Sequence, residues 1–189
     1  MNFLDIFFWK KKPKKSKYLP EKREPLEISF VKKFTLNGGK FLYCENEDEL
    51  RVNFQNILIE NEISVSELLS NEKSIIEYFN IDNNSINPKA LVMNCEFLIS
   101  NQGSIMVSNH QILDKKLNQL PDILIIRAKT SDFKYDVSEA MSGIKNKYDE
   151  SIPSNITNIH PTNREKKSNF ISYKRTSKEL YLLLRDVNK

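Results

Sequence analysis

The feature that most constrains the fold is a short, almost wholly apolar run late in the chain. Residues 122–128 read Asp-Ile-Leu-Ile-Ile-Arg-Ala and follow a proline at position 121. A run of this length, rich in Ile and Leu and preceded by a chain breaker, is typical of a strand buried on both faces. Such strands occur mainly where helices cover a parallel sheet. The run therefore predicts an α/β domain with residues 122–128 at the centre of its sheet.

Helical and extended patterns alternate around this strand. Residues 26–34 carry an apolar face at helical spacing, and Asn37-Gly38-Gly39 predicts a left-handed cap that ends the helix. The other predicted elements are a strand over 40–44, a helix over 45–58, weaker helical segments over 65–69 and 74–79, strands over 95–100 and 104–107, a helix over 137–148, and strands over 156–159 and 180–184. We expect one α/β domain over residues 25–189, with a mostly parallel sheet flanked by helices.

Residues 1–24 differ from the rest of the chain in charge. They hold eight Lys or Arg against three Asp or Glu, whereas the remaining residues hold 21 basic and 22 acidic side chains. The body therefore lacks the positive excess of a nucleic-acid-binding face, and we expect no nucleic acid partner. An apolar segment that ends at Phe7, Phe8 and Trp9 is too short to span a bilayer. The lysines follow this apolar segment, whereas the positive charges of a signal peptide precede its apolar segment, so we do not expect a signal peptide.

Two interpretations of this tail stay open. An aromatic segment followed by lysines suits peripheral contact with an anionic membrane surface through residues 1–24. The alternative is a flexible tail that the lysines keep soluble, or one that docks its aromatic residues on a partner. Under either interpretation we expect a cytoplasmic protein.

Residues that bind metals are sparse. Cys44 and Cys95 are 51 residues apart, and the chain has only two histidines, His110 and His160. This is too few for a zinc or iron-sulfur motif, so we expect no metal and no cofactor. We expect each cysteine to be buried and reduced, and each histidine to lie in a loop.

The hairpin predicted around Gly103 supplies one group of candidate site residues. Glycine lets the backbone approach a ligand closely, while the amides beside Gln102 and the Ser104 hydroxyl could donate to an anion. The same three residues also suit an ordinary hairpin turn. Glu96, at the start of the hairpin, is a weak candidate for an acid or base, or else a solvated carboxylate at an edge.

Arg164, with Asn163 beside it, is the strongest charged candidate. A guanidinium group binds carboxylate or phosphate through two parallel hydrogen bonds, and this one follows a predicted strand and Pro161. Arg164 also begins a stretch of basic residues of the kind that is usually only solvated. Nothing in the spacing decides between catalysis and binding.

Taken in order, these landmarks resemble the LUD (lactate-utilisation) family over roughly residues 26–188. The resemblance rests on the helix end at 34–39, on Cys-Glu-Phe-Leu-Ile-Ser-Asn-Gln-Gly-Ser-Ile-Met at 95–106, on Asn-Gln-Leu-Pro at 118–121, and on Ile-Pro-Ser at 152–154 with Pro-Thr-Asn-Arg at 161–164. The chain departs from the family where Gln102 replaces the Thr of Thr-Gly-Ser. It departs again at 160–164, a partial match to Gly-Pro-Ser-Arg-Thr, and at 172–177, which replace a Gly-X-His-Gly-Pro element.

The resemblance implies a fold like the sugar-phosphate isomerase and CoA-transferase superfamily, with its site at the carboxyl ends of strands. It implies a small anionic organic acid or phosphorylated metabolite as ligand. It also implies a cofactor-free subunit beside an iron-sulfur oxidoreductase subunit in a lactate-utilisation type system. The altered motifs favour a second interpretation, a non-catalytic scaffold or binding subunit tethered by its N-terminal tail.

Overall fold

The computed structural model describes residues 24–112, 115–148, 151–161 and 178–187. Residues 1–23, which make up nearly all of the predicted tail, lie outside the described residues, as does the segment 162–177 that holds Asn163 and Arg164. The described chain is α/β with a parallel central sheet, so the predicted fold class is confirmed.

The helices are α1 (Leu26–Leu36), α2 (Glu47–Glu60), α3 (Lys73–Phe79), α4 (Asn109–Ile112) and α5 (Val137–Lys147). The strands are β1 (Lys40–Cys44), β2 (Leu68–Leu69), β3 (Ala90–Asn94), β4 (Phe97–Ile99), β5 (Ser104–Val107), β6 (Ile123–Lys129), β7 (Phe133–Lys134), β8 (Thr157–Ile159) and β9 (Glu179–Arg185). Single 3-10 turns lie at Val65–Glu67, Leu117–Gln119 and Thr130–Asp132.

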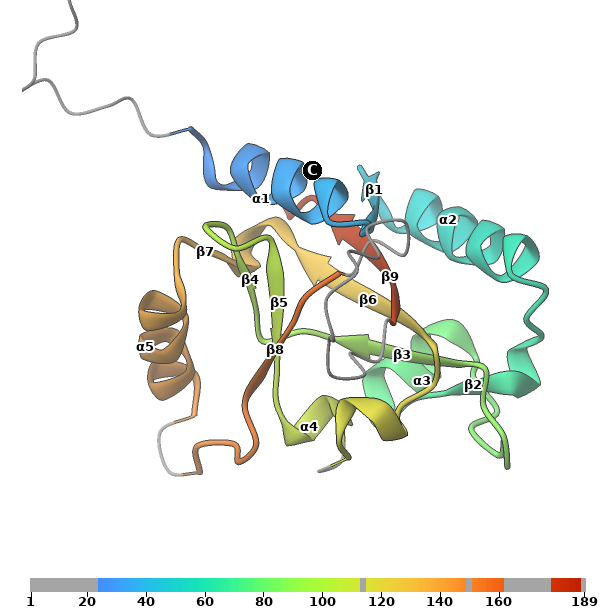
Figure 1. The fold of residues 1–189 in the computed structure, drawn as a ribbon. Coiled ribbons are helices and arrows are strands. Elements are labelled where there is room, and N and C mark those ends of the chain that lie inside the picture. Colours follow the sequence, from blue (N-terminus) through green and yellow to red (C-terminus); the bar gives the residue numbers. More distant parts are fainter. Residues whose placement is uncertain (1–23, 113–114, 149–150, 162–177, 188–189) are drawn as a thin grey trace, which may run out of the picture.

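The larger sheet has five strands in the order β1-β9-β6-β3-β2, and all its neighbours are parallel (Figure 1). Strand β6 lies in the middle, where Ile125 is paired with Val92 of β3 on one side and Tyr181 of β9 on the other. This is the strand predicted from residues 122–128, and its central position is confirmed.

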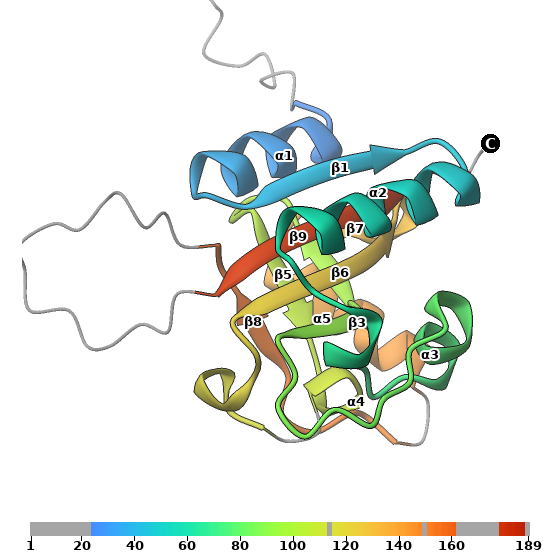
Figure 2. The same ribbon diagram turned by 90° about the vertical axis from the view of Figure 1, so that its right-hand side faces the viewer.

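Helices α2 and α3 cover one face of the larger sheet, as Figure 2 shows. Phe54 of α2 and Phe79 of α3 contact each other, with ring centroids 4.0 Å apart. Together with their helical neighbours they pack on Val92, Ile125 and Leu183 of the central strands. This layer matches the prediction that helices flank the sheet.

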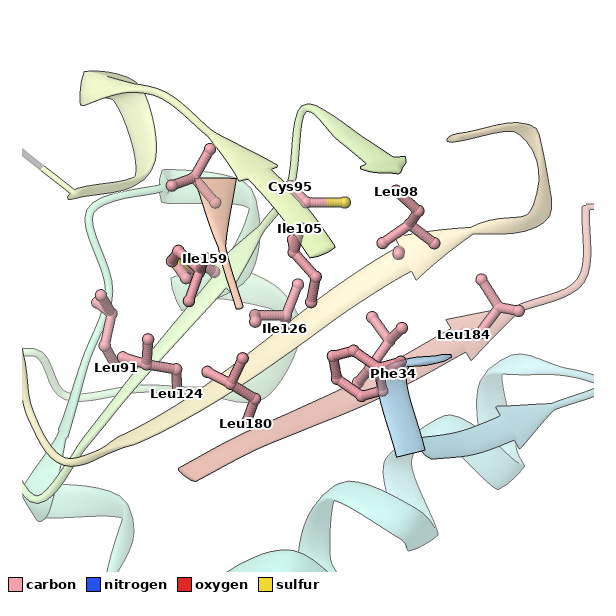
Figure 3. Close-up of a cluster of buried hydrophobic side chains, with 14 of the residues drawn as sticks. Phe34, Leu91, Cys95, Leu98, Ile105, Leu124, Ile126, Ile159, Leu180 and Leu184 are labelled. Atoms are coloured by element: carbon pink, nitrogen blue, oxygen red, sulfur yellow. The ribbon is translucent and has the colours of Figure 1, made fainter. Parts of the chain in front are cut away.

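The opposite face is covered mainly by a second sheet, whereas the sequence predicted helices there. Its four strands have the order β7-β4-β5-β8, and α1 packs beside it. Figure 3 shows Leu98 and Ile105 of this sheet facing Leu124 and Ile126 of β6. Its outer face is covered by α5, so strands of both sheets are buried on two sides.

One short segment was not assigned from the sequence and another was assigned wrongly. Residues 90–94 form β3, a strand of the larger sheet, and the chain crosses to the second sheet at Cys95 and Glu96. The segment 65–69, predicted helical, forms one 3-10 turn followed by β2. Periodicity cannot separate helix from strand in apolar runs this short. Residues 68 and 69 form a strand because they pair with β3.

Both cysteines are free and buried, as predicted. Across the part of the chain that the structure describes, no helix is long and apolar enough to cross a membrane.

Candidate functional site

A polar cavity of about 410 Å³ lies at the carboxyl ends of β3 and β6. Asn94 ends β3, and residues 127–129 end β6. The remaining wall comes from the start of α3, from α4, and from the end of α5. Loops at this edge of a parallel sheet commonly form ligand sites, because the chain diverges there into helices on opposite faces.

The basic wall of the cavity is formed by Arg127 and Lys129. The Arg127 guanidinium carbon lies 4.6 Å from the centre of the Tyr78 ring, and its Nη2 lies 3.3 Å from Oε1 of Glu47. Arg127 Nε is buried and has no hydrogen-bond partner among the described residues. Within the same residues, no carboxylate lies within ion-pairing distance of the Lys129 ammonium. The Lys129 ammonium can therefore donate a hydrogen bond to a ligand oxygen in the cavity.

Glu47 is shared between two guanidinium groups. Besides Arg127, it contacts Arg185 Nη1 at 2.6 Å and accepts a hydrogen bond from the Tyr78 hydroxyl. Burial raises the pKa of Glu47, but Tyr78 and the two arginines outweigh that effect and lower it. One ionised carboxylate thus faces two permanent cations, which leaves the cluster net positive.

The acidic residues of the cavity are engaged with backbone at the strand ends. Glu72 accepts hydrogen bonds from the Asn94 amide nitrogen at 2.6 Å and from its side-chain Nδ2 at 2.9 Å. Asp132 accepts one from the Lys129 amide at 2.7 Å, and burial raises the Asp132 pKa. These carboxylates fix the loops after β3 and β6.

Behind the cavity wall, Glu96 is the centre of a buried hydrogen-bond network. Its carboxylate accepts hydrogen bonds from Ser108 Oγ at 2.8 Å, Gln111 Nε2 at 3.1 Å and Lys147 Nζ at 2.8 Å. The Tyr148 hydroxyl lies 3.1 and 3.2 Å from its two oxygens. Every donor except Ser108 also lines the cavity, so the network holds this wall in place.

The network fixes the charge of its members. Burial raises the pKa of Glu96, but hydrogen bonds from Lys147 and Ser108 outweigh it and the pKa is lowered. Burial and the charge of Glu96 raise the pKa of Tyr148. Glu96 is therefore an ionised acceptor and Tyr148 a protonated donor, whose oxygen also lies 3.4 Å from His110 Nδ1.

Glu96 lies directly before β4, whereas it was predicted within the start of a strand over 95–100, and only 2% of the residue is exposed. The alternative of a solvated carboxylate at an edge is therefore wrong. Its role as an acid or base stays a prediction, and its saturated hydrogen-bonding makes it a positioning residue for Lys147 and Tyr148.

The predicted turn Gln102-Gly103-Ser104 lies at the opposite end of the β4–β5 hairpin from Glu96. The amides of Gln102 and Gly103 both donate to the Ile99 carbonyl, at 3.3 and 2.9 Å, and Ser104 Oγ lies 3.3 Å from Gln102 Oε1. The structure does not bring this turn together with the cavity. Anion binding by the turn stays a prediction.

Strand β8 leads toward the same turn. Ile159 lies opposite Ile105, so the chain that continues through His160 and Pro161 runs toward the Gly103 end of the hairpin. Beyond it, Asn163 and Arg164 are outside the described residues, and their part in a site also stays a prediction.

Sequence reasoning missed the residues that line the cavity. His110 was predicted to lie in a loop, but it belongs to α4 and forms part of the wall. The signal for Arg127 and Lys129 was their position at the end of a strand predicted to be central. Within the described ranges, no group of three or more His, Cys, Asp or Glu side chains is placed to hold a metal ion.

Comparison with known proteins gives a likeness of fold. No protein-family model matches the chain, and no curated protein matches it. Among solved structures, a DUF162 family protein from Deinococcus radiodurans is similar, with a TM-score of 0.58 and 13% sequence identity. The match covers 85% of this chain and 95% of that one. At such low identity the likeness shows a shared α/β fold and carries no statement about activity.

Proposed function

We propose that the cavity at the ends of β3 and β6 binds a small anionic metabolite, either an organic acid or a phosphorylated compound. The observation that carries this proposal is the basic wall: Arg127 and Lys129 line the cavity, and among the described residues no carboxylate lies within ion-pairing distance of the Lys129 ammonium. Guanidinium and ammonium groups of this kind bind the oxygens of carboxylate or phosphate.

The size and polarity of the cavity support a small ligand. A volume of about 410 Å³ lies at the lower end of the range of small-molecule sites. Asn94, Ser74 and Tyr148 supply neutral polar groups around the basic wall, which suits hydroxyl or carbonyl groups on the same ligand.

Binding is supported better than any particular reaction. Glu96 is ionised and its oxygens are occupied by four side chains, so it has little capacity to take a proton from a ligand. Both thiols are buried, and burial raises the pKa of Cys95 well above its ordinary value, which keeps it protonated. We therefore assign a binding role and no reaction.

We further propose that the chain is LUD-like and acts as a cofactor-free, cytoplasmic subunit beside an iron-sulfur oxidoreductase in a lactate-utilisation type system. The fold likeness to a DUF162 family protein is compatible with a LUD-like fold, and the role in a lactate-utilisation type system rests on the sequence resemblance. Co-purification of the full chain with an iron-sulfur protein tests it. The altered Thr-Gly-Ser and Gly-Pro-Ser-Arg-Thr motifs favour the alternative of a non-catalytic scaffold tethered by residues 1–24.

A thermal-shift screen tests the binding proposal, with lactate, other carboxylates, sugar phosphates, folates and coenzyme A as probes. A ligand at about 100 times its Kd stabilises the protein by roughly 2.7 kcal/mol. We expect the shift to be lost in Lys129→Ala and kept in Lys145→Ala, an exposed lysine of α5 outside the cavity wall. Absence of any shift in the unmodified protein would favour the scaffold alternative.

Arg164→Ala separates the cavity from the site predicted around Gly103. A shift that persists in Arg164→Ala and disappears in Lys129→Ala assigns the ligand to the cavity. The opposite pattern assigns it to the predicted site at Gly103 and Arg164.

A further inference from the structure

An apolar groove of about 270 Å³ runs between α1 and β1, and it shares no lining residue with the polar cavity. It is lined by Ile28 and Val31 of α1, by Phe41 and Tyr43 of β1, and by Leu184 of β9. Ile28 is 47% exposed and Tyr43 is 43% exposed, so large apolar surfaces face solvent here. The groove also borders β1, the edge strand of the larger sheet.

Acidic side chains gather at the Tyr43 end of the groove. The Tyr43 hydroxyl donates to Oδ2 of Asp186 at 2.7 Å. This hydrogen bond, with desolvation and the nearby charges of Asp186, Glu45 and Glu49, raises the pKa of Tyr43 to about 12. An occupant that pairs an apolar segment with adjoining positive charge would complement both features.

The chain itself contains a segment of that composition. Residues 3–9 read Phe-Leu-Asp-Ile-Phe-Phe-Trp, and six lysines follow by position 17. These residues lie outside the described part, which begins two residues before α1. Ile28 of the groove is in the first turn of α1, so the tail joins the body beside the groove.

The length of the connection allows the segment to fold back. Residues 10–23 can span at most about 45–50 Å when extended. Two turns of a helix such as α1, which borders the groove, are only about 11 Å long, so the connection can reach any part of the groove. A connection of this length also gives the tethered segment an effective concentration in the millimolar range. Even modest apolar contact is then sufficient for occupancy.

We propose that residues 3–9 of this chain dock on the groove between α1 and β1, with the following lysines facing Asp186, Glu45 and Glu49. The aromatic side chains of the segment then cover Ile28 and Tyr43. This assignment is independent of the ligand proposed for the cavity, because no residue lines both.

Trp9 is the only tryptophan in the chain and reports directly on this docking. In the full-length protein we expect its fluorescence maximum at a shorter wavelength than in a free peptide of residues 1–17, with weaker quenching by acrylamide. Ile28→Glu places a charge in the groove and is expected to return both signals to the peptide values. Ile59→Glu is the matched control, since Ile59 is an exposed residue of α2 outside the groove, and it should leave the emission unchanged.

A second variant leaves the folded body untouched. Joint replacement of Phe7 and Phe8 by Ser should also expose Trp9, even if Ile28→Glu proves unstable. Emission of the unmodified protein equal to that of the peptide would overturn the proposal. It would equally be overturned by a shift that grows with protein concentration, which indicates docking on a second copy, or by one that needs vesicles of anionic lipid, which indicates a membrane site.

Discussion

The ammonium group of Lys147 lies 2.8 Å from Oε2 of Glu96, and this ion pair ties the end of α5 to the start of β4. Its two members differ in exposure: the Glu96 side chain is fully buried, whereas 47% of the Lys147 side chain is exposed. A lysine left without its partner can return to water. A carboxylate left without its partner stays buried, so loss of Lys147 is the more damaging change.

We expect Lys147→Met to reduce the free energy of unfolding by about 1–3 kcal/mol at neutral pH, because Glu96 keeps its burial and loses its strongest donor. Urea unfolding measures the change. The control is Lys145→Met on the same helix, for which a change within about 0.5 kcal/mol is expected. Equal effects of the two variants would contradict the role assigned to the ion pair.

The pH dependence of stability follows from the lowered pKa of Glu96. A carboxyl whose pKa is lower in the folded state contributes stability above its unfolded pKa, about 4.3, and loses that contribution as the pH falls through the folded value. Stability of the unmodified protein should therefore fall more steeply than that of Glu96→Gln below about pH 4.3. Denaturant unfolding at a series of pH values measures both slopes, and identical slopes would refute the prediction.

Gly103→Ala is expected to destabilise the hairpin. Gly103 has a φ of 62°, and a Cβ atom at this position would lie 2.6 Å from Lys33 Cβ and 2.7 Å from the Phe34 nitrogen of α1. The left-handed backbone alone costs on the order of 1 kcal/mol for a residue with a side chain, and the clash with α1 backbone adds to it.

Thermal unfolding checks this prediction, with Gly38→Ala as control. Gly38 also has a positive φ, of 94°, and within the described residues no contact of an added Cβ atom there is as close as those at Gly103. We expect Gly103→Ala to be the more destabilising. Equal effects would mean that contact with α1 is unimportant and would return weight to the ligand-binding interpretation of the turn.

A polar cluster around Tyr181 joins the amino ends of β1 and β9. Tyr181 is buried, with 1% of the residue exposed. Its hydroxyl accepts a hydrogen bond from Asn61 Nδ2 at 2.8 Å and contacts the ammonium of Lys40. Tyr181→Phe removes this acceptor from a buried site. We expect a loss of about 1–2 kcal/mol in urea unfolding.

Tyr43→Phe is the matched control for that variant. Its hydroxyl bonds to Asp186 at an exposed position, where such contacts contribute little, so a change below about 0.5 kcal/mol is expected. A ranking in which Tyr43→Phe is the more costly would contradict the importance given to burial.

The sequence was informative where one pattern had one structural solution. The run at 122–128 became β6 at the centre of the sheet, and Asn37-Gly38-Gly39 ended α1 with Gly38 in the left-handed region. Three strands of the second sheet, β4, β5 and β8, correspond to predicted strands, but β7 is only two residues long and was missed. Strand patterns do not show which sheet a strand joins, so the separate second sheet was not predicted.

The site was harder to predict than the fold, since it depends on which ends of the elements meet. Glu96 was recognised as a candidate, but its donors Ser108, Gln111 and Lys147 come from positions 12 to 51 residues away. The pairing of β4 with β5 and the packing of α5 on these strands bring them together. Arg127 lies at the end of a strand predicted to be central, but no motif around it marks it as lining a cavity.

The most direct test of the proposed function is an amide NMR titration of the full-length protein with inorganic phosphate and with lactate as probes. We predict that the saturable shifts cluster on Asn94, His110 and residues 127–129, and that Lys129→Ala weakens them. Shifts confined to residues 102–104, or no saturable shift with any anion found active in the thermal screen, would contradict the assignment of the cavity as the anion site.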